Sequence, residues 1–367
     1  MFVALKGENF DANTFAAEAL EKGAAFAIVD DPDVEKDGRF LLTTDSLKAL
    51  QDLATYHRRQ LQIPFMGITG TNGKTTTKEL VCSVLSQHYK AFATQGNLNN
   101  HIGVPLTILS IGRDTEIAII EMGANHQNEI GFLCGIAQPT HGLITNVGKA
   151  HLEGFGGFEG VKIAKGELYR YLAETGGVAF VNQDNTHLME MSRRHRLKDI
   201  IYYGTRPENF VTGTLAESSP LQIDWKKDAA ASSVTSNLTG IYNFENILSA
   251  ITVGCYFNLS KEEINNGIST YFPTNNRSQI KTTEKNTVIC DYYNANPSSM
   301  GVALENLASI TGDNKAFILG DMFELGDDSE SEHKAIVEKG LQLPAARKIF
   351  IGNEFFKLRK EPGEFYR

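Results

Sequence analysis

Residues 67–80 read GITGTNGKTTTKEL, and this stretch decides the expected fold. Three glycines stand three residues apart, at Gly67, Gly70 and Gly73, and Lys74 follows the last of them. The strict P-loop pattern requires a glycine five residues before its second glycine, and Ile68 occupies that position. The strict pattern therefore fails, although the loop keeps the small residues and the lysine that the chemistry of a phosphate site needs.

Glycines let backbone N–H groups converge on an anion, and a helix that begins near Lys74 adds partial positive charge. Lys74 contributes a full charge, and Thr75 is placed to bind Mg²⁺. The alternative is a chance Gly-Lys-Thr in a surface turn. A buried strand before the loop and a helical pattern after it favour the phosphate site.

Around this loop the chain alternates between short apolar strands and helical stretches. The expected strands are PFMGIT, AFAT, EIAIIEM, GLITNV and GVAFVN, with helices near 74–88, 126–137 and 158–174. This alternation predicts an α/β fold with a central, doubly wound P-loop ATPase domain. Pro64 and Pro273 lie near the expected boundaries. We therefore divide the chain into residues 1–62, 63–273 and 274–367.

Composition excludes several function classes. The 367 residues carry a net charge of −9 without a run of Lys or Arg, which disfavours nucleic acid and membrane surfaces as partners. No apolar run approaches membrane-spanning length. The four cysteines form no C-x-x-C pair, which is typical of reduced thiols in a cytoplasmic protein.

Two strand ends carry further candidate residues. Glu121 ends the strand EIAIIE, where a parallel sheet presents its catalytic edge, and a carboxylate there can hold magnesium. A strand-end glutamate that faces water is the alternative, which the nearby phosphate loop makes less favoured. His151 also follows a strand, but a lone histidine is more often structural than a ligand. Lys162 and Lys165 lie on an expected helix, where a solvated surface position is the default.

Two asparagine-rich segments suit polar ligands, although asparagine also serves turn geometry. The first is TQGNLNNHIGVP at residues 94–105. The second is DYYNANPSSM at 291–300, where Asp291 ends a strand and Pro297 begins a helix.

Taken in order, the motifs resemble those of the Mur ligases. They are GITGTNGKTTT, EMGANH, NVGKAHLEGFG, AKGELY, YNFEN, NNRSQ, DYYNANPSSM and LGDMFELG. The resemblance covers nearly the whole chain and implies a three-domain architecture. It also implies an enzyme that uses ATP and Mg²⁺ to join D-alanyl-D-alanine to UDP-MurNAc-tripeptide through an acyl phosphate, in peptidoglycan precursor synthesis.

The resemblance assigns roles residue by residue. Lys74, Lys165, His151 and Glu121 would be catalytic. Thr75 and Glu121 would bind one Mg²⁺ and His151 a second, and Lys165 would join them if it is carbamylated, as in related ligases. Contacts to ATP are implied for Gly70, Thr71, Asn72, Gly73, Lys74, Thr75, Thr76, Asn243, Asn246, Arg277 and Asp291.

Substrate contacts follow in the same way. The nucleotide-sugar domain would contribute Lys6, Gly7 and Asp11, and the tripeptide loop would contribute Thr94, Asn97, Asn99 and Asn100. Tyr293, Asn294 and Asn296 would lie near the dipeptide.

Both ends depart from the family pattern. The strand and turn that normally precede MFVALKG are absent, and the chain stops at GEFYR before the usual last strands. We therefore expect both outer domains to be truncated. Two alternatives stay open: a sister ligase with a different acceptor, and a nucleotide-binding fragment without ligase activity.

Overall fold

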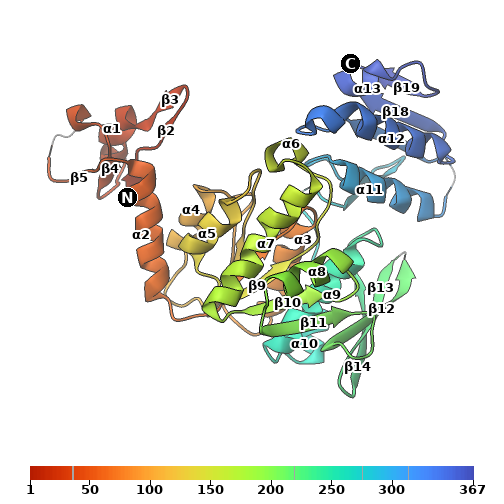
Figure 1. The fold of residues 1–367 in the computed structure, drawn as a ribbon, viewed down its shortest axis with the longest axis horizontal. Helices are drawn as coiled ribbons and strands as arrows, with labels where there is room; N and C mark the ends of the chain where they lie inside the picture. Colours follow the sequence, from red (N-terminus) through yellow and green to blue (C-terminus); the bar gives the residue numbers. More distant parts are fainter. Residues whose placement is uncertain (35–36, 219, 275, 313) are drawn as a thin grey trace.

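The computed structural model describes residues 1–34, 37–218, 220–274, 276–312 and 314–367. Asn275, the first residue of the NNRSQ motif, lies outside this set. The elements form three groups, with the largest in the middle and the two ends of the chain in the outer groups (Figure 1). Helix α2 (Ser46–Gln60) runs from the N-terminal group to the middle one.

The middle group is built on one sheet. Within the described residues it has nine strands in the order β14-β13-β12-β11-β10-β9-β6-β8-β7. Pairing is parallel from β7 to β12. The parallel strands are β6 (Phe65–Thr69), β7 (Ala91–Ala93), β8 (Ile117–Glu121), β9 (His141–Ile144), β10 (Val178–Asn182), β11 (Asp199–Gly204) and β12 (Val211–Ser218). This confirms the expected α/β fold.

Helices cover both faces of this sheet because its central strands are apolar on both sides. In β8, Ile117 and Ile119 pack into one core cluster, whereas Ala118 and Ile120 pack into the other. The first face is covered by α3 (Lys74–Leu85), α9 (Asn243–Tyr256) and α10 (Lys261–Ser269). The second is covered by α4 (Gly103–Leu109), α5 (Glu129–Ala137), α7 (Phe158–Thr175) and α8 (Thr186–Arg194), with the short α6 (Leu152–Phe155) before α7.

The topology fixes where a ligand site forms. Strand β6 lies between β8 and β9, so the chain moves outward on both sides of it, and the carboxyl ends of these strands open a crevice. The register pairs Ile68 of β6 with Glu121 of β8 and Thr69 with Ile144 of β9. The loop after β6 and the Glu121 carboxylate therefore lie at one sheet edge.

Beyond β12 the sheet becomes antiparallel, through β13 (Leu221–Lys227) and β14 (Ala230–Ser236). Alternate residues of β13, among them Ile223 and Trp225, are buried against α9 and α10. In the strand order, β14 and β7 are the two edge strands of this sheet, so the antiparallel extension is farthest from β7.

The N-terminal group has a small parallel sheet of β1 (Phe2–Val3), β4 (Ala27–Val29) and β5 (Phe40–Leu42). A hairpin of β2 (Lys6–Gly7) and β3 (Phe10–Asp11) precedes the 3₁₀ helix η1 (Ala12–Phe15) and helix α1 (Ala16–Glu21). A second 3₁₀ helix, η2, covers Pro32–Val34. The hydrophobic core of this N-terminal group is separate from the two cores that flank the central sheet.

The C-terminal group has a parallel sheet of β17 (Ala316–Gly320), β18 (Arg347–Ile351) and β19 (Glu364–Tyr366). Its helices are α11 (Pro297–Ser309), α12 (Ser329–Gln342) and α13 (Asn353–Lys357), with the 3₁₀ helix η3 at Gly326–Asp328. The strand that precedes DYYNANP, β16 (Thr287–Cys290), pairs antiparallel with β15 (Gln279–Thr282) and not with β17.

Candidate active site

The phosphate loop is shaped by two glycines that other residues could not replace. Gly70 has a φ of 147° and Gly73 a φ of 76°, and both values favour glycine. A Cβ atom on Gly73 would lie 2.6 Å from Oδ1 of Asn246, and one on Gly70 would lie 2.0 Å from Oγ1 of Thr145. The loop therefore packs tightly against neighbouring polar residues and leaves its backbone open to the cavity.

Lys74 folds back over this loop. Its Nζ donates hydrogen bonds to the carbonyl oxygens of Gly70 and Thr71, each at 2.9 Å. Burial lowers the pKa of Lys74 to about 8, while the nearby Glu121 carboxylate opposes this shift. The ammonium thus stands at the start of α3, where a phosphate would be its natural partner.

Thr75 and Glu121 present two buried oxygens without a hydrogen-bond partner among the described residues, Oγ1 of Thr75 and Oε2 of Glu121. The other carboxylate oxygen, Oε1 of Glu121, accepts a hydrogen bond from Nδ2 of Asn99 at 2.8 Å. Hydroxyl and carboxylate oxygens are the ligands that Mg²⁺ prefers, so these residues fit a magnesium ion. No group of three or more His, Cys, Asp or Glu residues that could hold a metal ion occurs in the described ranges.

A cavity of about 1130 Å³ opens in front of the loop. It lies between the central sheet edge and the start of the C-terminal group. The sequence-predicted residues that line it are Thr71, Asn72, Gly73, Lys74, Thr76, Asn99, Asn100, Glu121, His151, Asn243, Asn246, Arg277, Asp291, Tyr293, Asn294 and Asn296. The structure thus brings together sixteen candidates that come from distant parts of the chain.

The remaining candidates do not line the cavity: Lys6, Gly7, Asp11, Gly70, Thr75, Thr94, Asn97 and Lys165. Four of these, Gly70, Thr75, Thr94 and Lys165, are buried behind its wall. Asn97 is exposed in the loop before α4. The other three belong to the N-terminal hairpin.

Lys165 is buried, so the default expectation of a solvated surface lysine was wrong. It lies on the inward face of α7, with a relative exposure of 2%. Its Nζ is 3.5 Å from the carbonyl oxygen of Ala124 and 5.0 Å from the ring centre of Phe155. Burial, with a second contribution from Lys74, lowers its pKa to about 7. Lys162 is also less exposed than expected, with 11% of its side chain accessible, and it forms ion pairs with Glu159 at 2.8 Å and Glu190 at 3.5 Å.

His151 connects the central group to the C-terminal group. It has a φ of 50° just before α6, and its Nδ1 is hydrogen-bonded to the carboxylate of Glu324 in the LGDMFELG motif. Lys149 forms an ion pair with Glu332 of α12. Two residues of the NVGKAH motif therefore hold the C-terminal group beside the cavity.

The asparagine pair of the YNFEN motif forms a chain of hydrogen bonds at the start of α9. Nδ2 of Asn246 donates to Oδ1 of Asn243 at 2.9 Å, and Thr77 donates to Oδ1 of Asn246 at 3.1 Å. Asn243 in turn donates to the carbonyl oxygen of Thr239 at 2.7 Å. Both amides are fixed against the phosphate loop.

The C-terminal group contributes a cluster of charged and aromatic residues. The guanidinium of Arg277 lies 3.9 Å above the ring centre of Tyr293, and its buried Nε has no hydrogen-bond partner among the described residues. Partial desolvation raises the pKa of Asp291, against a hydrogen bond from the backbone N–H of Ser278 and the charge of Arg277. These groups and Lys74 line the same cavity.

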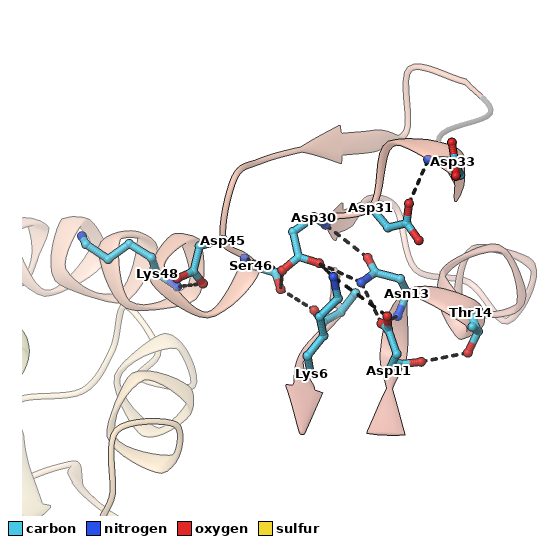
Figure 2. A network of polar contacts seen from close by, with 11 residues as sticks. Lys6, Asp11, Asn13, Thr14, Asp30, Asp31, Asp33, Asp45, Ser46 and Lys48 are labelled. Atoms are coloured by element: carbon cyan, nitrogen blue, oxygen red, sulfur yellow. Dashed lines mark hydrogen bonds and ion pairs between the residues drawn. The ribbon is translucent and has the colours of Figure 1, made fainter. Parts of the chain in front are cut away.

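The N-terminal candidates form a separate polar network (Figure 2). Lys6 pairs with Asp30 at 3.0 Å and with Asp11 at 3.9 Å. Asp30 also accepts hydrogen bonds from Asn13 at 2.7 Å and from the backbone N–H of Ser46 at 3.3 Å. The network joins the hairpin to the beginning of α2.

Sequence reasoning missed three residues that shape the site. Asn146 accepts a hydrogen bond from the backbone N–H of Asn72 at 3.0 Å. Glu167 accepts from the backbone N–H groups of Asn128 and Gly131, at 2.5 and 2.7 Å, and so holds the loop that begins α5. Lys78 is buried beside Glu121. Its spacing of three residues from Thr75 places both on one helix face, which was a usable signal.

Comparison with known proteins identifies the family. Residues 68–254 match the Mur ligase middle domain, and residues 276–363 match the Mur ligase, glutamate ligase domain. The chain belongs to the Mur ligase family. No helix in the described ranges is both long enough and apolar enough to cross a membrane.

Several Mur ligases named UDP-N-acetylmuramoyl-tripeptide–D-alanyl-D-alanine ligase are similar to this chain. That of Bacillus subtilis is 36% identical and is matched over 91% of this chain and 73% of its own length. That of Escherichia coli is 33% identical over 96% of this chain and 78% of its own length.

Solved Mur ligase structures match the whole chain. A crystal structure of MurF from Acinetobacter baumannii aligns with a TM-score of 0.89 and 33% identity, over 100% of this chain and 81% of that one. MurF ligase from Thermotoga maritima, crystallised in complex with ADP, aligns with a TM-score of 0.83 and 25% identity. The alignment covers 100% of this chain and 89% of that one. The expected Mur ligase α/β fold is confirmed, whereas the expectation that both outer domains are truncated finds no support in these matches.

Proposed function

We propose that this Mur ligase joins D-alanyl-D-alanine to UDP-MurNAc-tripeptide, with ATP as the energy source, in peptidoglycan precursor synthesis. One observation carries the proposal: a single cavity is lined by the phosphate loop, by Glu121 and by residues of the DYYNANPSSM segment. The names of the similar relatives support the choice of substrates.

The reaction would proceed in two steps. A carboxylate oxygen of the tripeptide attacks the γ-phosphorus of ATP, an acyl phosphate forms and ADP leaves. The amine of the dipeptide then attacks the acyl carbon, the amide bond forms, and inorganic phosphate and a proton are released. The protein supplies positioning and charge stabilisation, as in other phosphoryl transfers.

We assign the phosphate contacts to the Gly70–Gly73 backbone and to Lys74, whose ammonium already lies over the loop. Thr75 and Glu121 would hold one Mg²⁺, which would neutralise charge on the phosphates. His151 would serve a second, and Lys165 would take part if carbamylated. Asn243 and Asn246 would contact adenine, and Arg277 and Asp291 would contact the phosphates and ribose.

Substrate contacts complete the proposal. Segment 94–100 would meet the tripeptide, and Tyr293, Asn294 and Asn296 would meet the dipeptide. Lys6, Gly7 and Asp11 would bind the nucleotide sugar within residues 1–62. We assign residues 63–273 to ATP binding and 274–367 to the third domain. A cytoplasmic location stays a prediction from the sequence.

Phosphate release tests this function. The purified 1–367 chain is incubated with Mg-ATP, UDP-MurNAc-tripeptide and D-alanyl-D-alanine, and each is omitted in turn. We expect release only when all three are present, together with UDP-MurNAc-pentapeptide as product. Release that continues without either acceptor substrate would identify an ATPase, and the absence of release with all three present would contradict the proposal.

A further inference from the structure

Lys78 is a buried lysine beside the candidate metal site that the proposed roles do not use. Its side chain is 3% exposed, and its Nζ donates a hydrogen bond to the carbonyl oxygen of Thr94 at 2.7 Å. The same Nζ lies 4.0 Å from Oε2 of Glu121 and 3.8 Å from Oε1 of Glu79. Burying an ammonium is costly unless it is paired and hydrogen-bonded, so an apolar side chain would fill this position at lower cost if packing were its purpose.

The partners of Lys78 are themselves connected. The backbone N–H of Glu121 donates to Oγ1 of Thr94 at 3.0 Å, so strand β8 and the first residue of segment 94–100 are joined directly. At the other end of this segment, Asn99 donates to Oε1 of Glu121 at 2.8 Å and accepts from the backbone N–H of Gly123 at 2.8 Å. Segment 94–100 is therefore tied to the Glu121 strand end at Thr94 and again at Asn99.

Lys78 contacts both segment 94–100 and Glu121. It binds the segment at the Thr94 carbonyl and lies on the Oε2 side of Glu121, whereas Asn99 holds the Oε1 side. The Glu121 carboxylate is thus enclosed between the ammonium of Lys78 and the amide of Asn99.

We propose that Lys78 is a positioning residue that fixes segment 94–100 against Glu121 and thereby aligns the tripeptide carboxylate with the metal-bound phosphates. The inference rests on the proposed function, in which segment 94–100 meets the tripeptide and Glu121 meets Mg²⁺. The ammonium acts through the Thr94 carbonyl and does not touch the reacting atoms.

The kinetic test uses Lys78→Met, which keeps the length of the side chain and removes its charge and donors. We expect the KM for UDP-MurNAc-tripeptide to rise roughly tenfold or more, the range for loss of a hydrogen bond to a charged group. The KM for ATP should change by less than about twofold, because the phosphate loop and Lys74 are untouched. Lys90→Met is the matched control, since Lys90 is exposed and pairs with Asp114 at the surface.

Hydrogen–deuterium exchange on the ligand-free protein gives a second, independent measurement. Lys78→Met should raise exchange of the amides in segment 94–100, while Lys90→Met should leave them unchanged. Equal exchange in Lys78→Met and wild type, with an unchanged KM for the tripeptide substrate, would overturn the role of Lys78. Failure of the wild-type chain to release phosphate would instead overturn the proposed function, so the two failures are distinguishable.

A second variant covers the case in which Lys78→Met does not fold. Lys78→Arg keeps a cation and a donor for the Thr94 carbonyl, and we expect its segment 94–100 to exchange as slowly as in wild type. Its KM for the tripeptide substrate should exceed that of wild type by less than about threefold, well below the effect expected from losing the hydrogen bond. Equal increases in the KM values for ATP and for the tripeptide substrate would point to a general structural role and would overturn the proposal.

Discussion

Nδ2 of Asn296 donates a hydrogen bond to Oδ1 of Asn72 at 2.8 Å and so joins the start of α11 to the phosphate loop. Oδ1 of the same Asn296 accepts from the backbone N–H of Ser299 at 2.9 Å and caps α11. The Nδ2 of Asn296 therefore contacts the phosphate loop, while its Oδ1 caps α11. The C-terminal group is thereby aligned with the loop that would hold the ATP phosphates.

Asn296→Asp separates these two functions. The carboxylate keeps an oxygen for the helix cap but loses the donor and places a negative charge opposite Oδ1 of Asn72. We expect kcat/KM to fall roughly tenfold or more, with a melting temperature within a few degrees of wild type. Steady-state kinetics and thermal unfolding measure both quantities.

The exposed Asn286→Asp is a suitable control, because it introduces the same charge on the same group of elements away from the cavity. Equal kcat/KM values for Asn296→Asp and Asn286→Asp would mean that the hydrogen bond between Asn296 and Asn72 does not contribute to activity.

The elements around the phosphate loop could be predicted from the sequence because their signals are local. The apolar run of β6, the glycines of the loop and the helix start at Lys74 lie within twenty residues, and the structure places them as expected. The position of Glu121 beside the phosphate loop was also predictable, since the carboxyl ends of neighbouring parallel strands meet at one edge of a sheet.

Other features depend on long-range packing, which local patterns do not encode. The burial of Lys165 depends on how α7 packs against the sheet. A lysine in a helical stretch, considered alone, indicates a solvent-exposed position. The partner of His151 comes from a loop 173 positions later, and nothing near His151 in sequence indicates Glu324. Strand β16 was predicted as a strand, but its pairing with β15 follows from the turn between them.

Lys74→Ala should abolish turnover while the fold stays intact. The variant removes a charge that would stabilise the transferring phosphoryl group, a loss that typically costs about a hundredfold or more in kcat. Phosphate release measures the activity, and circular dichroism with thermal unfolding measures the fold. Near-normal activity in a folded variant would contradict the assignment of the phosphate loop.

Glu121→Gln tests the magnesium site. The amide keeps the shape of the side chain but is a weaker ligand than a carboxylate, so the Mg²⁺ concentration for half-maximal activity should rise by roughly tenfold or more. A titration of activity with Mg²⁺ at saturating ATP measures this shift. Glu116→Gln, at the exposed residue just before the same strand, is the control. An unchanged Mg²⁺ requirement would remove Glu121 from the metal site.

Asp30 should make the N-terminal group sensitive to acid. Hydrogen bonds from Asn13, Lys6 and Ser46 outweigh burial and lower the pKa of Asp30 to about 2. A carboxyl whose pKa is lower in the folded state stabilises the fold above its unfolded pKa, near 4, and this contribution is lost as the pH falls toward 2. At about 1.4 kcal/mol for each pH unit, a shift of roughly two units makes the loss between about 2 and 3 kcal/mol.

Asp30→Asn should therefore be less stable than wild type at pH 7, and the difference should shrink as the pH approaches 2. Denaturant unfolding at several pH values measures it. Asp52→Asn, which alters an exposed ion pair with Lys48, should show a much smaller dependence. A stability difference for Asp30→Asn that did not vary with pH would mean that packing, and not ionisation, explains the role of Asp30.

Lys165 offers the sharpest test of how a buried cation could serve a metal site. Because burial lowers its pKa to about 7, a large fraction of its amine is neutral near that pH. A neutral amine can attack carbon dioxide, form an N–C bond and release a proton, and the resulting carbamate carries a carboxylate. Lys165→Ala should therefore be nearly inactive and partly rescued by short carboxylic acids that enter the vacated space. Lys162→Ala, on the same helix but at a lysine already paired with Glu159 and Glu190, should keep its activity. Loss of activity without rescue at any acid concentration would argue that Lys165 acts as an amine, while equal loss in Lys162→Ala would indicate that α7 itself had been disturbed.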